Sequence, residues 1–352
     1  MAYTTINDPS KHFQIKLYTG NGSTNALTFD GNSDMQPDWL WTKCRSDAFD
    51  PIIRDTSRGI DKRLLVHATD AEGGATGTSA FGSDGFTLDN TNTVNRNNDT
   101  YVGWAWKANG GTTTNVSASG AVNAGTHQAN TTGGLSIITY TGEDNIGDTV
   151  THGLGAVPGF IIIKDRDNSS NWAVYHHKNT SAPETEYLFL NNNNATADAA
   201  NYFSDTAPTS TVFTVGQNGD TGDADAYVAY CFTEIQGYSK FGSYTGNGNA
   251  DGPFNYTGFK PAWLMIKRTS NAENWFIVDN RRETSNPRGV KFIYANTNDA
   301  EVSSDKHLDF LSNGFKLRDV TGFHNDNGET YIYVAFAESP FVSSAGVPTT
   351  AE

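Results

Sequence analysis

The chain has 352 residues, of which 39 are acidic and 24 basic, giving a formal net charge of −15. Such a surface repels phosphate backbones, so the charge argues against binding to nucleic acid. Aromatic residues make up 12% of the chain, more than a disordered protein carries, and abundant Gly, Asn, Thr and Asp are typical of a turn-rich β protein.

Membrane insertion and disulfide bonding are also disfavoured. No apolar run approaches the length that spans a bilayer, and Met1 to Asn7 lack the apolar core of a signal peptide. We therefore expect a soluble protein that is made and assembled in a cytoplasm. The two cysteines, Cys44 and Cys231, form no CxxC motif, so neither a disulfide framework nor a thiolate metal site is expected.

The chain begins with a polar arm, which a first unit of short strands follows. Residues 1–12 show no periodic pattern and are predicted to be an extended or disordered arm. Alternating apolar residues from Phe13 to Leu17 predict a half-buried strand, which opens a unit over residues 13–107. Further apolar runs predict strands at 39–43, 64–66, 85–88 and 101–106.

Residues 108–134 differ in composition from the unit before them. They are mainly Gly, Ala, Ser, Thr and Asn, with almost no large apolar side chain. Such a segment buries too little surface to offset its ordering entropy. We expect it to be a linker or a loosely held arm.

Two further units, at residues 135–236 and 237–342, repeat the pattern of the first, and residues 343–352 form a small, polar tail. In each unit a turn signal precedes an apolar strand that is entered through a proline. The three copies are Tyr18–Gly22 with Pro37–Lys43, Tyr140–Gly142 with Pro158–Lys164, and Tyr244–Gly248 with Pro261–Lys267. Many short strands at even spacing predict an all-β protein of about three tandem β-sandwich units, with little helix.

The last strand of each unit indicates how a unit packs. Val102, Trp104 and Trp106 point to one side of this strand, and smaller residues point to the other. The same alternation recurs in the other two units. Because both faces look covered, we predict that this strand is central in its sheet. Cys231 lies on the small face of the second copy and is predicted to be a buried filler, in preference to a reactive thiol.

The repeated motifs carry a family resemblance over nearly the whole chain. They are Tyr18–Gly22, Pro37–Lys43, Ser83–Phe86, Tyr101–Lys107, His152–Lys164, Tyr227–Glu234, Gly237–Gly248, Ser312–Leu317 and Tyr331–Phe341. With these motifs the chain resembles a family of repeat-containing virion proteins of marine tailed bacteriophages. The resemblance implies a structural or tail-fibre-like protein of the virion with jelly-roll or lectin-like β-sandwich domains. It supplies no catalytic residue.

A lysine near the end of the proline-led strand is the sharpest repeated polar feature, and the three copies are Lys43, Lys164 and Lys267. These lysines are candidate ligand contacts. The alternative interpretation lays each stem along apolar surface and leaves the charge in water. Because lysine is seldom fully buried, we favour the alternative.

The histidines do not suggest a metal site. His176 and His177 are the only adjacent pair, and neighbouring strand residues face opposite ways, so the two cannot readily bind one ion. The remaining histidines are scattered along the chain, at His12, His67, His127, His152, His307 and His324.

An acidic loop with Asp220, Asp223 and Asp225 is a candidate calcium site, because closely spaced carboxylates can hold this ion. Its spacing does not match the calcium-loop template, so a solvated hairpin tip is the preferred interpretation. The asparagine cluster at 191–194 is predicted to be a turn, although such side chains also suit sugar hydroxyls.

Catalysis has no visible signature in the sequence. No local pair of carboxylates has the spacing that glycoside hydrolysis needs, and the GxSxG, HExxH and phosphate-loop motifs are absent. Tryptophans could stack on sugars, but most of them recur at matched strand positions, which favours core packing. They are Trp39, Trp41, Trp104, Trp106, Trp172, Trp263 and Trp275.

We therefore expect a non-enzymatic virion component without a cofactor. The first hypothesis is a tail-associated, fibre-like protein that contacts the host surface, and its glycans, through loops of the sandwiches. One alternative is a capsid-decorating or connector-associated protein, for which residues 1–11 are a candidate docking arm. A weaker alternative is a polysaccharide-degrading enzyme. By analogy with phage fibres, a homo-oligomer such as a trimer is expected.

Overall fold

The computed structural model describes residues 3–74, 77–304, 307–320 and 322–350. Antiparallel β-strands dominate these residues, so the predicted all-β sandwich class is confirmed. Helix within the described ranges is limited to single turns, as expected for a chain rich in turn residues. These are η1 (Pro9–Lys11), α1 (Asn92–Asn95), η2 (Pro183–Thr185) and α2 (Ala200–Phe203).

Unit one, residues 13–107, contributes a large sheet and a small one. Its strands are β1 (Phe13–Thr19), β2 (Asn25–Leu27), β3 (Trp39–Cys44), β4 (Ile52–Asp55), β5 (Lys62–Leu65), β6 (Gly73–Gly74), β7 (Thr78–Gly82), β8 (Gly85–Leu88) and β9 (Thr100–Trp106). The large sheet has the order β1-β9-β3-β4-β5-β6 and the small sheet the order β2-β8-β7. Phe86 and Leu88 of the small sheet pack against Leu40 and Tyr101 of the large one.

Unit two, residues 135–236, is built in the same way, and two strands from the preceding segment extend its large sheet. The strands are β10 (Thr114–Val116), β11 (Gly125–Asn130), β12 (Leu135–Thr141), β13 (Asp148–Thr151), β14 (Phe160–Asp165), β15 (Trp172–His176), β16 (Glu186–Phe189), β17 (Ala197–Asp198), β18 (Val212–Val215) and β19 (Ala226–Phe232). The large sheet has the order β10-β11-β12-β19-β14-β15-β16-β17, and β13 pairs with β18.

Unit three, residues 237–342, repeats the order of unit one. Its strands are β20 (Ser239–Thr245), β21 (Phe254–Tyr256), β22 (Phe259–Arg268), β23 (Phe276–Asp279), β24 (Lys291–Tyr294), β25 (Val302–Ser303), β26 (Leu308–Leu311), β27 (Gly314–Leu317) and β28 (Thr330–Pro340). The large sheet has the order β20-β28-β22-β23-β24-β25 and the small sheet the order β21-β27-β26.

The last strand of each unit is central, as predicted. β9 lies between β1 and β3, β19 between β12 and β14, and β28 between β20 and β22. In β9, Tyr101 and Ala105 face the small sheet of the same unit, while Trp104 and Trp106 face away from it. The buried Cys231 of β19 occupies the small face, as the sequence predicted.

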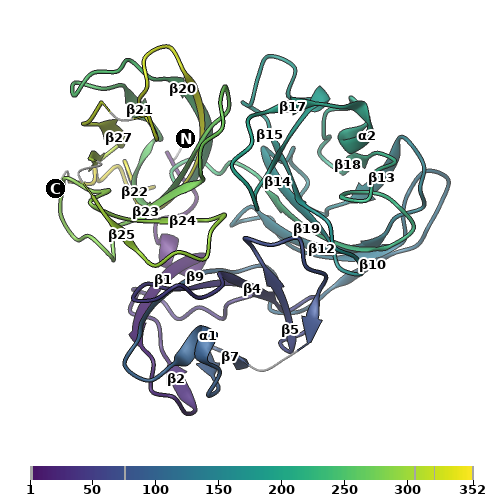
Figure 1. The fold of residues 1–352 in the computed structure, drawn as a ribbon, viewed down its shortest axis with the longest axis horizontal. Helices are drawn as coiled ribbons and strands as arrows, with labels where there is room; N and C mark the ends of the chain where they lie inside the picture. The colour runs from purple at the N-terminus through teal and green to yellow at the C-terminus, as the bar shows by residue number, and fades with distance from the viewer. Residues whose placement is uncertain (1–2, 75–76, 305–306, 321, 351–352) are drawn as a thin grey trace.

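The bulky faces of the three large sheets meet in one shared core. Figure 1 shows the units as three lobes around a common centre, with unit one below and units two and three above it. The ring of Trp106 lies 5.6 Å from that of Trp263 and 5.3 Å from that of Phe336, both in unit three. The ring of Trp39 lies 4.9 Å from that of Tyr230 in unit two. Each unit therefore buries its second apolar face against the other two units.

The predicted tryptophan core is confirmed, because all seven tryptophans are at most 2% exposed. Contacts of this kind combine a large buried area with favourable tilted and edge-to-face ring geometries. Truncating one such ring typically costs about 3–5 kcal/mol of stability. The central rings therefore contribute to the stability of the contacts between units.

Of the two expectations about irregular segments, the loose linker is wrong, and the arm is ordered and not disordered. Residues 108–134 are not a loose linker, because β11 pairs along its length with β12 and extends the sheet of unit two. The N-terminal arm is ordered from Tyr3 onward and lies against units two and three. The Tyr3 hydroxyl donates to the carbonyl of Gly258 in unit three (2.9 Å), Thr4 Oγ1 donates to the carbonyl of Gln236 in unit two (2.8 Å), and Ile6 is 3% exposed. Backbone pairing with β12 orders the first of these segments, and docking on the folded units orders the second. Neither interaction can be read from the hydrophobicity of the segment itself.

Candidate functional site

The three strand lysines are buried, so the interpretation that placed their charges in water is wrong. Lys43, Lys164 and Lys267 are each 0% exposed. Their ammonium groups lie in the contacts between units, which we call the one–two joint, the two–three joint and the three–one joint. Burial of a lysine is possible here because its aliphatic stem packs along the apolar edge of the strand. The ammonium group then donates to carbonyl oxygens beyond that edge.

Each lysine donates to a backbone carbonyl of the preceding unit in the ring. Lys164 Nζ lies 3.2 Å from the carbonyl of Thr69 in unit one. Lys267 Nζ lies 3.2 Å from the carbonyl of Asn193 in unit two. Lys43 Nζ lies 3.0 Å from the carbonyl of Asn298 in unit three.

Burial lowers the pKa of all three lysines. Desolvation of the ammonium group brings the pKa of Lys43 and of Lys164 to about 8. The pKa of Lys267 falls further, to about 7, for the same reason. The three groups thus titrate in or just above the neutral range. Because each ammonium group donates to a carbonyl of a neighbouring unit, we interpret the lowered pKa as a consequence of burial in the joints.

A charged network runs through the one–two joint beside the lysine. Arg58 Nε lies 2.5 Å from Asp55 Oδ2, and Arg58 Nη1 lies 3.0 Å from Glu72 Oε2. From unit two, Arg166 donates through Nε and Nη2 to the two carboxylate oxygens of Glu72, and the Tyr230 hydroxyl donates to Asp55 (2.7 Å). Burial acts to raise the pKa of Glu72, but hydrogen bonding from Arg166 and the charge of Arg58 hold it below the usual value.

The three–one joint repeats this network with different residues. Arg282 Nε lies 2.6 Å from Asp279 Oδ2, and Arg282 Nη1 lies 3.3 Å from Glu301 Oε2. Arg45 of unit one pairs with Glu301 (2.9 Å), and the indole of Trp104 donates to Asp279 (3.1 Å). Burial of Asp279 is offset by the Arg282 charge and by these hydrogen bonds, which leave its pKa below the usual value.

In the two–three joint neutral groups take the positions of this network, although Glu234 and Lys240 form an ion pair elsewhere between the same two units. His176 stands where the other joints have Asp, and its Nε2 lies 3.1 Å from the carbonyl of Tyr333. Asn179 takes the place of the paired arginine and accepts from Thr196 Oγ1 (2.7 Å). The Thr196 amide donates to the carbonyl of Thr269 (2.9 Å). Full burial lowers the pKa of His176 to about 3, so the ring is neutral at physiological pH.

Asp220 and Asn191, two further candidates from the sequence, have internal partners as well. Asp220 is 8% exposed, accepts from the Asn171 amide (2.6 Å) and from the Tyr202 hydroxyl (3.0 Å), and so is not a solvated loop tip. The side chain of Asn191 caps the start of β15 by accepting from the Trp172 amide (3.0 Å). Among the described residues, no group of three or more His, Cys, Asp or Glu could hold a metal ion. No helix in the described ranges is long and apolar enough to cross a bilayer.

Sequence reasoning missed the Asp–Arg pairs of the joints. Asp55 with Arg58 and Asp279 with Arg282 share one spacing at the end of the same strand of the sandwich. That Asp-x-x-Arg repeat was the available signal. Its absence from unit two, where His176 and Asn179 stand instead, hid the equivalence of the three joints.

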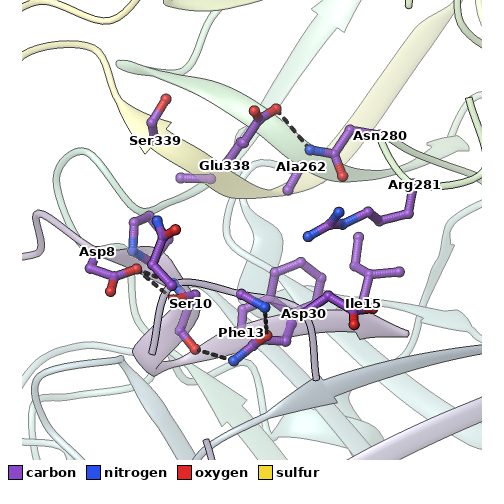
Figure 2. Close-up of a pocket in the computed structure, with 15 residues that line it drawn as sticks. Asp8, Ser10, Phe13, Ile15, Asp30, Ala262, Asn280, Arg281, Glu338 and Ser339 are labelled. Carbon is purple, nitrogen blue, oxygen red and sulfur yellow. Dashed lines mark hydrogen bonds between the residues drawn. The ribbon is translucent and has the colours of Figure 1, made fainter. Parts of the chain in front are cut away.

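A polar cavity of about 330 Å³ lies in the three–one joint, beside η1. Figure 2 shows Asp8, Asp30 and Glu338 around its opening, with the Arg281 side chain extending toward the middle. Glu338 accepts from the side chain of Asn280 (2.7 Å).

A second cavity, of about 370 Å³, lies where the arm crosses units two and three. It is lined by Glu234, Lys240 and two tyrosines, Tyr3 and Tyr256, whose hydroxyls are 2.9 Å apart. Tyr256 and Phe254 of β21 remain 52% and 45% exposed. Tyr256 lines this cavity, and Phe254 is exposed two residues before it on the same strand.

Comparison with known proteins gives one match. A family model described as a domain of unknown function, DUF7483, matches residues 8–340. No curated protein and no solved structure gives a significant match. The matched range begins just before β1 and ends with the last residue of β28, so it takes in all three large sheets.

Proposed function

The chain belongs to the DUF7483 family. We propose that it is a non-enzymatic structural component of a bacteriophage virion. Within the virion it is a tail-associated, fibre-like protein that contacts the host surface and its glycans. The resemblance of its repeated motifs to phage virion proteins supports the location. The integrated three-lobed body supports a structural role.

The observation that carries this proposal is that the buried charged and titratable side chains are bonded to neighbouring units. The repeated lysines, the paired arginines and carboxylates, and His176 are all occupied in contacts between units. An enzyme keeps such groups poised toward a cleft where they meet a substrate. Here they stabilise a body that holds its loops in fixed relative positions, as a multivalent contact protein requires.

Unit three offers the contact surface, through the exposed aromatic pair of β21. By strand register, Phe254 and Tyr256 stand where unit one has Ala26 and Thr28. Unit two has threonines at the same positions. Large exposed rings beside a polar cavity are a typical interaction surface, and aromatic faces suit the apolar faces of sugars.

Labelling of purified virions tests the location. An antibody against residues 135–341 is expected to label the tail or its fibres. Label spread over the capsid would replace the adhesion role with capsid decoration. Absence of label, despite expression of the protein in infected cells, would overturn the proposal.

Substitution of the aromatic pair tests the contact. The double variant F254A/Y256A is expected to fold normally and to lose at least about tenfold in binding to isolated host envelope, since each ring contributes on the order of 1 kcal/mol or more. The matched control is T149A/T151A, at the equivalent strand positions of unit two. Equal binding by wild type and F254A/Y256A would exclude this surface.

A further inference from the structure

The first strand of each unit is an edge strand of its own sandwich, and two of the three edges are covered. In unit two, β11 pairs with β12, and Gln128 lies opposite Ile137. The Gln128 side chain is fully buried in the one–two joint. Its Oε1 accepts from the Gly111 amide (2.9 Å), and its Nε2 donates to the hydroxyls of Thr56 and Ser57 (2.7 Å each).

In unit three, side chains of unit two cover the equivalent edge. Phe241 of β20 lies opposite Val334, in the register that Ile137 has opposite Tyr230. The Phe241 amide donates to Glu234 Oε1 (2.8 Å), and its carbonyl lies 2.8 Å from His177 Nε2. The backbone groups at this position thus point away from the sheet and are paired.

In unit one, the same edge is open. Ile15 lies opposite Trp104, the register position of Phe241, so the alternation of an antiparallel ladder points its N–H and C=O away from β9. Leu17, two residues on, is oriented alike. For neither residue do the described parts of the chain provide a hydrogen-bond partner on this side. The space in front of Ile15 is the cavity of the three–one joint.

The far wall of this cavity matches the wall that receives β11 in the one–two joint. Asn280 and Arg281 follow Asp279 as Thr56 and Ser57 follow Asp55, so they stand where the partners of Gln128 stand. Arg281 is exposed and, within the described ranges, its guanidinium has no hydrogen-bond partner. Figure 2 shows it extending into the opening, toward the side of Ile15.

We propose that the open edge of β1 receives an extended segment of another polypeptide. The segment adds antiparallel to β1, as β11 adds to β12, and pairs with the free backbone groups of Ile15 and Leu17. Opposite Ile15 it carries an amide or carboxylate side chain, which bonds to Asn280 and Arg281. A cavity of about 330 Å³ is too small for a folded body, so we infer that the partner enters as an extended chain. The inference rests on the proposed function only for where the natural partner is sought, among virion proteins.

Two synthetic peptides test the edge directly. One has the sequence of residues 124–131, which includes β11, and the other carries Q128E. Amide exchange in the free protein is expected to be faster at Ile15 and Leu17 than at Ile137 and Phe241. Peptide at ten times its Kd is expected to slow exchange at Ile15 and Leu17 about tenfold, because only the bound edge is protected.

Charge reversal at the far wall tests the side-chain contact. R281E is expected to weaken binding of the Q128E peptide at least about tenfold, because an attractive pair becomes a repulsive one. K178E is the matched control, since Lys178 is exposed at the equivalent position of the two–three joint, and it should leave the affinity unchanged.

The proposal is overturned if neither peptide slows exchange at Ile15 and Leu17, or if K178E weakens binding as much as R281E. These results are independent of the virion proposal. Edge binding without label on virions would reject the proposed function alone, and labelled virions without edge binding would reject this inference alone.

Discussion

The one–two and two–three joints solve the same packing problem with different chemistry. Both place a buried lysine on a carbonyl of the preceding unit, and both bury a polar group at the end of the strand that directly follows the proline-led one. In the one–two joint that group is Asp55, with its arginine. In the two–three joint it is His176, which burial keeps neutral and whose Nε2 lies beside the carbonyl of Tyr333.

The difference indicates that the positions of the bonded groups define these joints, and that an ion pair at those positions is not required. A buried ion pair gains Coulomb energy but pays for desolvation, so its replacement by well-packed neutral groups is often neutral in stability. The unpaired half of such a network is costly, however, because one charge then stays buried alone. The two joints should therefore respond very differently to single substitutions and similarly to replacement of the whole set.

The largest effect is expected when one charged joint loses a single member. R58M removes the guanidinium between Asp55 and Glu72 and is expected to lower the free energy of unfolding by about 3–5 kcal/mol. N179A, at the equivalent neutral position, should cost only about 1–2 kcal/mol, because it leaves one hydroxyl without its acceptor. Urea denaturation of both variants measures the difference, and equal losses would contradict the comparison.

The lysines should make stability rise with pH in every joint. Their folded pKa values of about 7 to 8 lie below that of a free lysine, so the unfolded chain binds more protons between about pH 7 and 10. The free energy of unfolding should therefore increase over this range, by as much as about 3 kcal/mol per lysine. Denaturation of K267M at several pH values should show a smaller slope. A slope equal to that of wild type would contradict the lowered pKa of Lys267 in the folded protein.

His176 should give the two–three joint a dependence on mild acid, at higher pH than the range in which the carboxyl groups of Glu72 and Asp279 in the other joints titrate. Its folded pKa of about 3 lies below the ordinary histidine value, so its contribution is fully present above about pH 6.5 and is lost as pH falls toward 3. Between pH 6.5 and 4.5 this loss amounts to about 2 kcal/mol. H176Q should flatten the stability profile there, whereas D55N in the one–two joint should leave that part of the slope in place.

The smallest effect is expected when the one–two set is replaced whole by its neutral counterpart. The quadruple variant D55H/R58N/E72T/R166T copies the two–three joint. It is expected to remain folded and to differ from wild type by no more than about 2 kcal/mol, much less than R58M. A loss equal to that of R58M would show that charge, and not geometry, defines this joint.

Much of the fold follows from local patterns in the sequence. The alternation of bulky and small residues around Trp104 places that strand at the centre of its sheet, because a strand covered on both faces has no exposed side. The repeated proline-led strands likewise predict that each unit has the same order. These features depend on neighbours within a few residues, which sequence periodicity reports well.

The joints depend on partners that periodicity does not report. Lys43 is buried because a carbonyl 255 residues away, at Asn298, meets its ammonium group. Its sequence neighbourhood is that of an ordinary strand-end lysine, which favours exposure. β11 is similar, since its polar residues predict a loose segment, and only the edge of β12 and the pocket around Gln128 give it order. Contacts between units decide both cases.

Calorimetric unfolding tests the central claim, that the three units share one core and form a single cooperative body. The account predicts one transition whose calorimetric enthalpy equals the van't Hoff enthalpy. It also predicts that R58M shifts the whole transition to lower temperature. Two or three separable transitions, of which R58M moves only one, would contradict the account and would mean that the units fold independently.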